Sequence, residues 1–253
     1  MSGIRWRIER FEDIDSTNTY LLAQARNGAA EGLVAVADHQ SAGRGRLDRR
    51  WESPPGSALM VSILLRPRLE AHEAHLVTGA VALAARSAVA EISGVTPGLK
   101  WPNDLVVDGA KLAGILAEAD AGAPGGLPGT TAVVVGMGLN LSWPGPEGAG
   151  GTSLELASGH LVDRDALLEA YLAALSPRLG DLETAAGRRR LGTELEGALV
   201  TLGTVVAVTT AEGVIHGRAS GLSEDGHLIV ETETGPLEVV TGDVTSLRSA
   251  PGG

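Results

Sequence analysis

Four arginines stand within eight residues of a loop that has almost no apolar side chains. The segment Gly43–Trp51 reads Gly-Arg-Gly-Arg-Leu-Asp-Arg-Arg-Trp. Its two glycines let the backbone approach an anion closely, and the arginines would neutralise the charge of that anion. We interpret the segment as a loop that folds over a phosphate and a carboxylate, with Trp51 as an apolar or stacking wall. The alternatives are a solvated basic loop and an RGG-like contact with nucleic acid.

The second candidate is a lysine, because this chain hardly uses lysine. Of its 20 basic residues, 18 are arginine and only Lys100 and Lys111 are lysine, and these two lie eleven positions apart. Lysine carries a compact point charge and arginine a planar fork, so the two are not interchangeable at a site. We therefore expect the segment that holds both lysines to need an ammonium in particular.

Lys111 begins an apolar strand that has a glycine, Gly114, inside it. A glycine weakens a strand unless a ligand or another backbone comes close to it. With a period of two, Lys111 would share an apolar face with Ala113, Ile115 and Ala117, and its ammonium could point into a pocket. The alternative is a hairpin lysine whose ammonium reaches water.

The segment Gly136–Leu141 closes another apolar run and resembles a nucleotide-binding turn only loosely. We interpret it as a tight turn that packs two strands. The sequence contains neither the Rossmann GxGxxG fingerprint nor a Walker A motif, so neither would explain nucleotide binding. Its six histidines form no HExxH pattern and no GxSxG is present, which argues against a dedicated zinc site and a nucleophile elbow.

The composition is that of an acidic protein without cysteine. The net charge of −11 disfavours a protein that wraps nucleic acid, because such binding depends on neutralising phosphates. In such an acidic chain the basic loop is an exception, which favours a local anion site there. The absence of cysteine excludes disulfides and thiolate sites. The N-terminus has no apolar signal core, and the run nearest to a membrane span, Val77–Val89, contains Arg86, so we expect a cytoplasmic protein.

The hydrophobic patterns predict helices and strands in mixed order, which favours an α+β fold over a doubly wound sheet. Ser16 is the N-cap candidate of the first helix, and Asp108-Gly109 predicts a two-residue hairpin turn. The predicted helices cover residues 16–25, 73–92, 152–157 and 163–182. The predicted strands cover residues 33–37, 59–65, 99–101, 105–107, 111–118 and 132–141.

The character of the chain changes after a basic turn at Arg188–Arg190. Short β runs, broken by glycine and aspartate, cover residues 205–209, 214–219, 228–231 and 237–240. About 50 residues with this pattern are typical of a small β-barrel. We place the boundary near residue 193, which gives a larger domain at 1–192 and a C-terminal barrel at 193–253.

Taken in this order and spacing, five segments resemble the motifs of the biotin protein ligases. They are Ser16-Thr17-Asn18; Gln40 with Gly43-Arg44-Gly45-Arg46 through Trp51; Lys100-Trp101-Pro102-Asn103-Asp104; Lys111-Leu112-Ala113-Gly114-Ile115-Leu116; and Gly136 to Asn140. The resemblance covers about residues 14–141 and is weaker for the C-terminal barrel. Its most specific part is the Lys-Trp-Pro-Asn-Asp run followed by Lys-Leu-Ala-Gly-Ile-Leu.

The resemblance implies a catalytic biotin- and ATP-binding domain of the class II aminoacyl-tRNA synthetase type, with a mixed sheet and helices, followed by an SH3-like β-barrel. It also implies a reaction in two steps. Biotin's carboxylate attacks the α-phosphate of ATP, with Mg²⁺ present, to give biotinyl-5′-AMP and pyrophosphate. A lysine of a biotin carboxyl carrier domain, in a carboxylase such as acetyl-CoA carboxylase, then attacks this mixed anhydride.

The same resemblance assigns roles to single residues. Ser16, Thr17, Asn18, Gln40 and Gly114 are expected to line the biotin pocket, the first four around the ureido head. Arg44, Gly45 and Arg46 are expected to order over the carboxylate and the phosphate, and Trp51 to flank the adenine. Asn103 and Asn140 would serve the nucleotide, and Asp104 its Mg²⁺. Lys111 is expected to contact both the carboxylate and the α-phosphate, and it forms the catalytic set with Arg44 and Arg46.

The nearest alternative is a lipoate–protein ligase, which performs the same chemistry on a related fold; the Gly-Arg-Gly-Arg loop with Lys-Trp-Pro-Asn-Asp favours biotin. An alternative of another class is a basic-loop nucleic-acid protein or an inactive regulator. We expect no tightly bound prosthetic group, no nucleic-acid or membrane partner, and a monomer or weak homodimer. Some family members carry an N-terminal helix-turn-helix and act as repressors; only fifteen residues precede Ser16, so we expect none here.

Overall fold

The computed structural model describes residues 4–47, 49–120 and 132–246. Its larger part is a seven-stranded sheet in the order β1-β2-β3-β7-β6-β5-β4. β1 and β2 are parallel, and the other neighbours in this sheet are antiparallel. The strands are β1 (Arg7–Ile14), β2 (Leu33–Gln40), β3 (Ala58–Leu65), β7 (Ala132–Asn140), β6 (Ala110–Asp120), β5 (Asp104–Val107) and β4 (Gly98–Lys100). The predicted α+β fold with a mixed sheet is confirmed.

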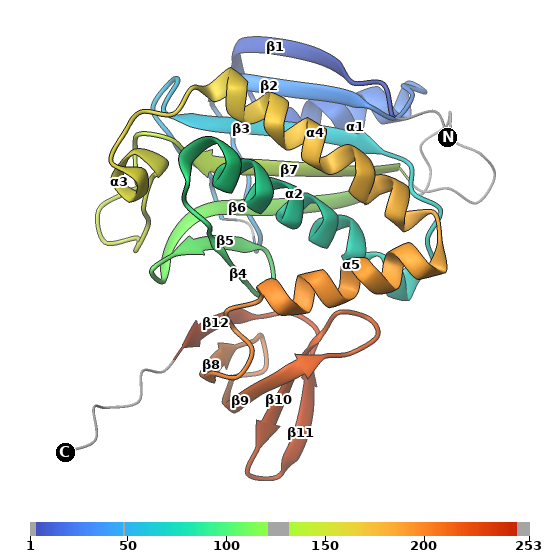
Figure 1. Cartoon of the computed structure of the whole chain (residues 1–253), viewed down its shortest axis with the longest axis vertical. Coiled ribbons are helices and arrows are strands. Elements are labelled where there is room, and N and C mark those ends of the chain that lie inside the picture. The colour runs from blue at the N-terminus through green and yellow to red at the C-terminus, as the bar shows by residue number, and fades with distance from the viewer. Residues whose placement is uncertain (1–3, 48, 121–131, 247–253) are drawn as a thin grey trace.

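Different helices cover the two faces of this sheet. Neighbouring residues of a strand point to opposite faces, so Val34 packs with α2 (His75–Ser93) and α4 (Arg164–Leu182), whereas Ala35 packs with α1 (Thr17–Arg26). In Figure 1, α2 and α4 lie in front of the sheet and α1 behind it. The rear face, which α1 covers only in part, carries the cleft described below.

Two local elements form as their residues predict. Ser16 caps α1: its hydroxyl accepts a hydrogen bond from the backbone N–H of Thr19 at 3.4 Å. Asp108 and Gly109 join β5 to β6 with φ angles of 50° and 81°. Positive φ at both central residues is what the tight Asp-Gly hairpin turn requires, so the predicted hairpin is confirmed.

Helix α2 is the core helix of the larger part. By length and composition alone it could cross a membrane, but 67% of its most apolar window is buried within the fold. It packs against α4 and against α5 (Ala185–Ala198). Gly79 allows this approach, since a Cβ at that position would lie 2.9 Å from Leu195 of α5. The apolar character of α2 is therefore explained by its place in the core.

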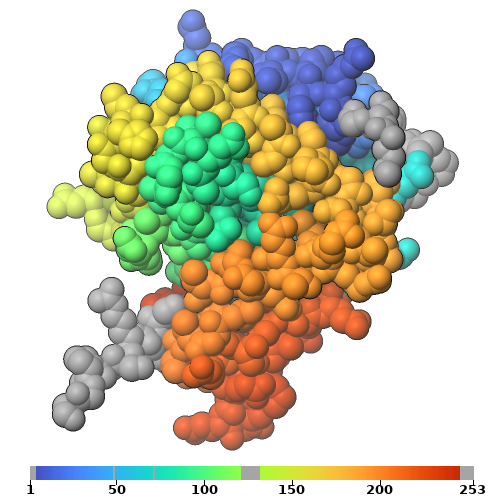
Figure 2. Space-filling view, in the orientation of Figure 1, coloured from blue at the N-terminus to red at the C-terminus, as the bar shows by residue number. Residues whose placement is uncertain are grey.

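The C-terminal part is a five-stranded antiparallel sheet in the order β11-β10-β9-β8-β12. In Figure 2 it forms a lobe below the helices of the larger part. Hydrogen bonds join the parts: among them, Trp101 Nε1 donates to Gly226 O at 3.1 Å, and Val200 N donates to Leu99 O at 2.9 Å. Its strands are β8 (Val205–Thr209), β9 (Val214–Leu222), β10 (Leu228–Thr232), β11 (Gly235–Val239) and β12 (Asp243–Ser246); the short helices elsewhere are η1 (Ala71–Glu73) and α3 (Leu154–Ser158).

The structure corrects the expected turn at Arg188–Arg190. These arginines lie inside α5, which Thr184 caps and Leu191 anchors to the core. The boundary near residue 193 falls within the same helix, and the division into 1–192 and 193–253 stays a prediction. Strand β1 is absent from the sequence-based prediction because five of its eight residues are charged. Such a strand is stable here because it is an edge strand, where charged side chains reach water.

Leu83→Ala in α2 tests how much the core depends on this helix. Leu83 is 1% exposed, so truncation leaves a cavity, and we expect the free energy of unfolding to fall by about 2–5 kcal/mol. Urea denaturation measures the change. The matched control is Leu161→Ala, because Leu161 is 75% exposed and its truncation should change the free energy by less than about 0.5 kcal/mol. Equal losses in both variants would contradict this assignment of the core.

Candidate active site

Two glycines lie side by side on neighbouring strands at the rear face of the large sheet. In the strand register Met60 of β3 lies opposite Gly138 of β7, Gly138 lies opposite Gly114 of β6, and Gly114 lies opposite Asp104 of β5. Residues that are directly opposite in a sheet point to the same face. The two glycines therefore leave a trough between Met60 and Asp104.

The indole of Trp51 fills part of this trough. A Cβ on Gly138 would lie 2.2 Å from Cε2 of Trp51, and a Cβ on Gly136 would lie 2.1 Å from Oδ1 of Asn18. The strand predicted over residues 132–141 is confirmed by β7, and the interpretation of Gly136–Leu141 as a tight turn is wrong, since residues 136–140 are extended. The glycines in this strand serve close approach by Trp51 and Asn18, which is the other use of glycine in a strand.

Lys111 reaches the trough because β6 contains a bulge. Lys111 lies opposite Val106 and Ala113 lies opposite Leu105, so Leu112 is an extra residue on β6. The extra residue reverses the alternation, and a Cβ on Gly114 would lie 3.1 Å from Lys111 Nζ. The expectation that Lys111 shares a face with Ala113, Ile115 and Ala117 is wrong for this reason.

Asp104 is the partner of the ammonium. Lys111 Nζ lies 2.7 Å from Asp104 Oδ1 and 6.0 Å from the centre of the Trp51 ring. Asp104 Oδ1 is a buried atom whose partner is this ammonium, and Trp51 Nε1 is a buried donor without a hydrogen bond among the described residues. Carboxylate oxygens are the hard ligands that a divalent cation such as Mg²⁺ prefers. Asp104 therefore has the donor chemistry that the predicted metal role needs.

The N-terminal end of α1 forms the second wall of the cleft. Thr17 donates to Gln40 Oε1 through its backbone N–H at 2.8 Å and its hydroxyl at 3.0 Å. Ser62 Oγ donates to Asn18 Oδ1 at 2.6 Å and lies 2.7 Å from Thr17 Oγ1. Ser16, Thr17, Asn18 and Ser62 are all buried. These bonds fix the polar groups of α1 against the sheet.

The loop with four arginines closes the cleft from outside. Arg44 Nη2 donates to Glu118 Oε2 at 2.7 Å. Arg46 donates to Asn103 Oδ1 at 3.2 Å and to Thr241 Oγ1 of the C-terminal part at 2.8 Å. Burial lowers the pKa of the Arg46 guanidinium, and the carboxylates of Asp243 and Asp104 oppose that shift.

The C-terminal part also holds the loop through Arg49, which forms an ion pair with Asp243 of β12. Within the loop, Trp51 N donates to Gly43 O at 3.0 Å and Gly45 N donates to Arg49 O at 2.7 Å. Asp48, which belongs to the predicted loop, lies outside the described residues. The loop is thus tied to the large sheet on one side and to the small sheet on the other.

Twelve of the thirteen residues that the sequence indicates line one cleft. They are Ser16, Thr17, Asn18, Gln40, Arg44, Gly45, Arg46, Trp51, Asn103, Asp104, Lys111 and Gly114. Asn140 lies beside it, in a neighbouring cavity that shares Trp51 and Lys111 with the cleft. Its Nδ2 donates to Thr152 O at 2.9 Å, and Lys111 is bonded to the same segment, through Thr152 N to Lys111 O at 2.8 Å.

Four residues that contribute to this cleft are not indicated by the sequence motifs. Ser62 has a visible signal, because it is the polar residue in the buried apolar strand Ala58–Leu65. Glu118 has a weaker signal, its position on the face of β6 that also carries Gly114. Thr241 and Asp243 have none, since only tertiary folding brings the C-terminal part to the loop.

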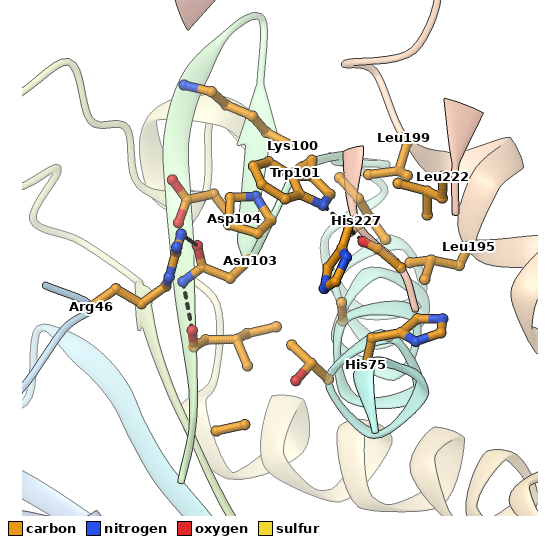
Figure 3. A pocket seen from close by; sticks show the side chains of 18 of the residues that line it. Arg46, His75, Lys100, Trp101, Asn103, Asp104, Leu195, Leu199, Leu222 and His227 are labelled. Carbon is orange, nitrogen blue, oxygen red and sulfur yellow. Dashed lines mark hydrogen bonds between the residues drawn. The ribbon is translucent and has the colours of Figure 1, made fainter. Parts of the chain in front are cut away.

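Another cavity, of about 340 Å³, lies between α2, α5 and the C-terminal sheet. Figure 3 shows Arg46, Asn103 and Asp104 on one side of it, and these three residues also line the cleft. On the C-terminal sheet, Asp225, His227 and Glu238 bring three possible metal-ligating atoms within 4.8 Å of one another. His227 Nδ1 lies 2.7 Å from Glu238 Oε1, so this group already satisfies part of its own bonding capacity.

Comparisons with known proteins assign the two parts of the chain to family models. Residues 11–140 match the biotin/lipoate A/B protein ligase family, and residues 201–245 match the biotin protein ligase C-terminal domain. The chain is 32% identical to the biotin–acetyl-CoA-carboxylase ligase of Mycobacterium tuberculosis, over 98% of this chain and 92% of that protein. It is 30% identical to the bifunctional ligase/repressor BirA of Bacillus subtilis, over 91% of this chain and 71% of that protein.

Solved structures are similar over nearly the whole chain. The biotin protein ligase from Aquifex aeolicus in complex with biotin and ATP superposes with a TM-score of 0.79 at 29% identity, over 96% of this chain and 99% of that chain. The biotin protein ligase from Leishmania major in complex with biotinyl-5-AMP gives a TM-score of 0.63 at 20% identity, which supports the fold.

Gly138→Ala tests the close approach of Trp51 to β7. The added methyl group overlaps the indole, so we expect a loss of about 1–3 kcal/mol in the free energy of unfolding, measured with urea. In a Trp51→Ala background the same substitution should cost much less, because the overlapping ring is gone. An equal cost in both backgrounds would show that Trp51 does not lie on Gly138.

Proposed function

The chain belongs to the biotin/lipoate A/B protein ligase family, and we propose that it acts as a biotin protein ligase at the cleft between α1, the Gly43–Trp51 loop and Lys111. The enzyme activates biotin with ATP to biotinyl-5′-AMP and transfers biotin to a lysine of a biotin carrier domain of a carboxylase. The class II synthetase-like domain is followed by an SH3-like domain, and the match of residues 201–245 supports biotin over lipoate.

The observation that carries the assignment of the cleft is the meeting of Lys111, Arg44 and Arg46 at one place. The first step requires two anions, a carboxylate and a phosphate, to come into contact. Cations fixed around the contact reduce this repulsion and stabilise the charge that develops on the α-phosphate as pyrophosphate leaves. Lys111 acts here as an electrostatic clamp on both anions, and the lysine that becomes modified belongs to the carrier.

The polar end of α1 is the proposed site of biotin's ureido head. Ser16, Thr17, Asn18 and Gln40 offer hydrogen-bonding groups that the fold has already oriented through Ser62 and through the bonds between Thr17 and Gln40. Such preorganisation lowers the entropy cost of binding. Gly114 keeps the floor of the cleft free of a side chain, so the carboxylate tail can pass close to the ammonium of Lys111.

The proposed nucleotide site lies on the other side of Lys111. Trp51 offers an aromatic face and a buried N–H without a bond among the described residues. Asn103 would contact the nucleotide from the turn before β5, and Asn140 from the end of β7. Asp104 would hold Mg²⁺, which screens the charge of the leaving pyrophosphate when it is bound. Closure of the loop keeps water from the acyl-adenylate, which hydrolyses readily.

We further propose that the enzyme uses ATP and Mg²⁺ and acts in the cytoplasm, as a monomer or weak homodimer, without nucleic acid. The division into a catalytic domain at 1–192 and a barrel at 193–253 stays a proposal; α5, which contains residue 193, packs on α2 and α4, and β8 of the small sheet begins at Val205.

Lys111→Ala tests the clamp. We expect biotin-dependent exchange between ATP and pyrophosphate to fall by about 100-fold or more, because the transition state loses a cation in a closed site. Lys111→Arg should not restore the rate, since a planar fork does not replace a compact ammonium. Arg10→Ala, which removes an exposed cation bonded to Asp165, is the control and should leave exchange unchanged.

The same assay tests the function itself. Wild-type protein with ATP, Mg²⁺ and biotin should exchange pyrophosphate and label a purified carrier domain, and lipoate should support neither step. Lipoate-dependent labelling without biotin-dependent labelling would overturn the assignment to biotin. Wild-type exchange in Lys111→Ala would overturn the clamp alone.

Arg46→Gly tests the closure of the loop. The variant loses the bonds to Asn103 and Thr241, so the loop should close less firmly and the acyl-adenylate should escape. We expect biotin on lysines of bystander proteins, detected by mass spectrometry of a mixture with serum albumin. A variant that still forms the adenylate, seen by exchange, but labels no bystander would contradict this role.

A further inference from the structure

Glu118 connects the two walls of the cleft through one atom. Its Oε2 accepts a hydrogen bond from Asn18 Nδ2 at 2.8 Å and another from Arg44 Nη2 at 2.7 Å. Glu118 is on β6, four residues beyond Gly114, and a strand of regular alternation presents both residues to the same face. Its side chain is 26% exposed. A single carboxylate oxygen thus links the end of α1 with the arginine-rich loop.

The carboxylate determines which way the Asn18 amide faces. Asn18 Nδ2 also lies 3.3 Å from Leu116 O, and both Glu118 and Leu116 offer only acceptors on this side. Ser62 donates to Asn18 Oδ1 from the opposite side. A flipped amide would place its oxygen against the carboxylate and lose these bonds. Glu118 therefore selects one orientation of a group in the proposed biotin pocket.

The same carboxylate holds Arg44 above the cleft. The loop that carries Arg44 is exposed to water, and a long arginine side chain loses rotamer freedom when it is fixed. The pair is partly exposed, with 41% of the Arg44 side chain accessible, so it positions the guanidinium without withdrawing it fully from a ligand anion. Because Asn18 and Arg44 share one acceptor atom, the order of the loop is coupled to the order of the pocket.

We propose that Glu118 is a positioning residue for biotin: it orients the Asn18 amide and places Arg44, and it contacts neither the reacting carboxylate nor the phosphate. The inference rests on the proposed function of the cleft. It predicts that loss of Glu118 weakens biotin binding more than ATP binding, because the carboxylate acts on the biotin pocket through Asn18. It also predicts that charge matters less than geometry, since a neutral amide oxygen can accept the same two bonds.

The experiment compares Glu118→Ala and Glu118→Gln by calorimetric titration with biotin and by KM for biotin and for ATP. For Glu118→Ala we expect the biotin Kd and KM to rise about 10-fold or more, with the ATP KM changed by less than about 3-fold, because the two oriented donors lose their acceptor. Glu118→Gln should stay within about 3-fold of wild type for biotin, because its amide oxygen replaces Oε2.

Asp120→Ala is the matched control. Asp120 lies two residues further along β6, carries the same charge and pairs with Arg26 at 2.7 Å, so its loss should leave biotin binding near wild type. A thermodynamic cycle with Asn18→Ala adds a readout that a general structural role would not change. If Glu118 acts through Asn18, Glu118→Ala should cost less biotin affinity in the Asn18→Ala background than alone.

The outcomes separate this inference from the proposed function. A wild-type protein that does not bind biotin would overturn both. Biotin binding by wild type with an unchanged Kd in Glu118→Ala, or an equal loss in Asp120→Ala, would overturn the role of Glu118 alone. An equal loss in Glu118→Ala and Glu118→Gln would show that charge and not position is required, and would also overturn it.

Discussion

The ammonium of Lys111 can enter the cleft only because the strand that carries it is irregular. A regular β6 would turn this side chain toward the buried face with Ala113 and Ile115, where an unpaired charge is costly. The extra residue Leu112 turns Lys111 toward Gly114 instead. Gly114, and Gly138 opposite it on β7, then leave the space in which the ammonium, the indole of Trp51 and a ligand can approach one another. A β-bulge that redirects a side chain beside a functional site is a recurrent use of this irregularity.

The cations of the cleft are paired with carboxylates of the protein. Lys111 pairs with Asp104 and Arg44 with Glu118, while Arg49 pairs with Asp243 across the two sheets. The side chains of the three cations are between 40% and 64% exposed, and ion pairs of that exposure contribute at most about 1 kcal/mol. Such weak pairs hold the cations in position, and little free energy is needed to exchange one anionic partner for another. In the proposed function, a substrate anion replaces a protein carboxylate as the partner of each cation, which requires no large rearrangement of the cleft.

Much of this fold follows from local rules that the sequence displays. The capped helix at Ser16, the Asp-Gly hairpin and the long buried helix α2 each have a signal within a few residues. The strand β1 and the helix α5 lack such a signal. The charged side chains of β1 are typical of an exposed segment, and the three consecutive arginines of α5 are typical of a polar turn. The residues of the cleft were indicated mainly by motif types and spacing. The orientation of Lys111 could not be predicted, since the bulge depends on the pairing of β5 with β6 and not on the alternation within β6.

The contribution of the C-terminal sheet could be predicted least. Thr241 follows Arg46 by 195 positions, and Asp243 follows Arg49 by 194, so no local pattern relates them. These bonds explain physically why a small sheet outside the catalytic fold matters to the cleft. A loop fixed at only one wall would retain much of its conformational freedom, and ligand binding would have to restrict it. With Arg44 bonded to the large sheet and Arg46 and Arg49 bonded to the small one, part of that entropy is already lost before the ligand binds. The small sheet thus preorganises the loop, and the relative position of the two sheets becomes a determinant of how the cleft closes.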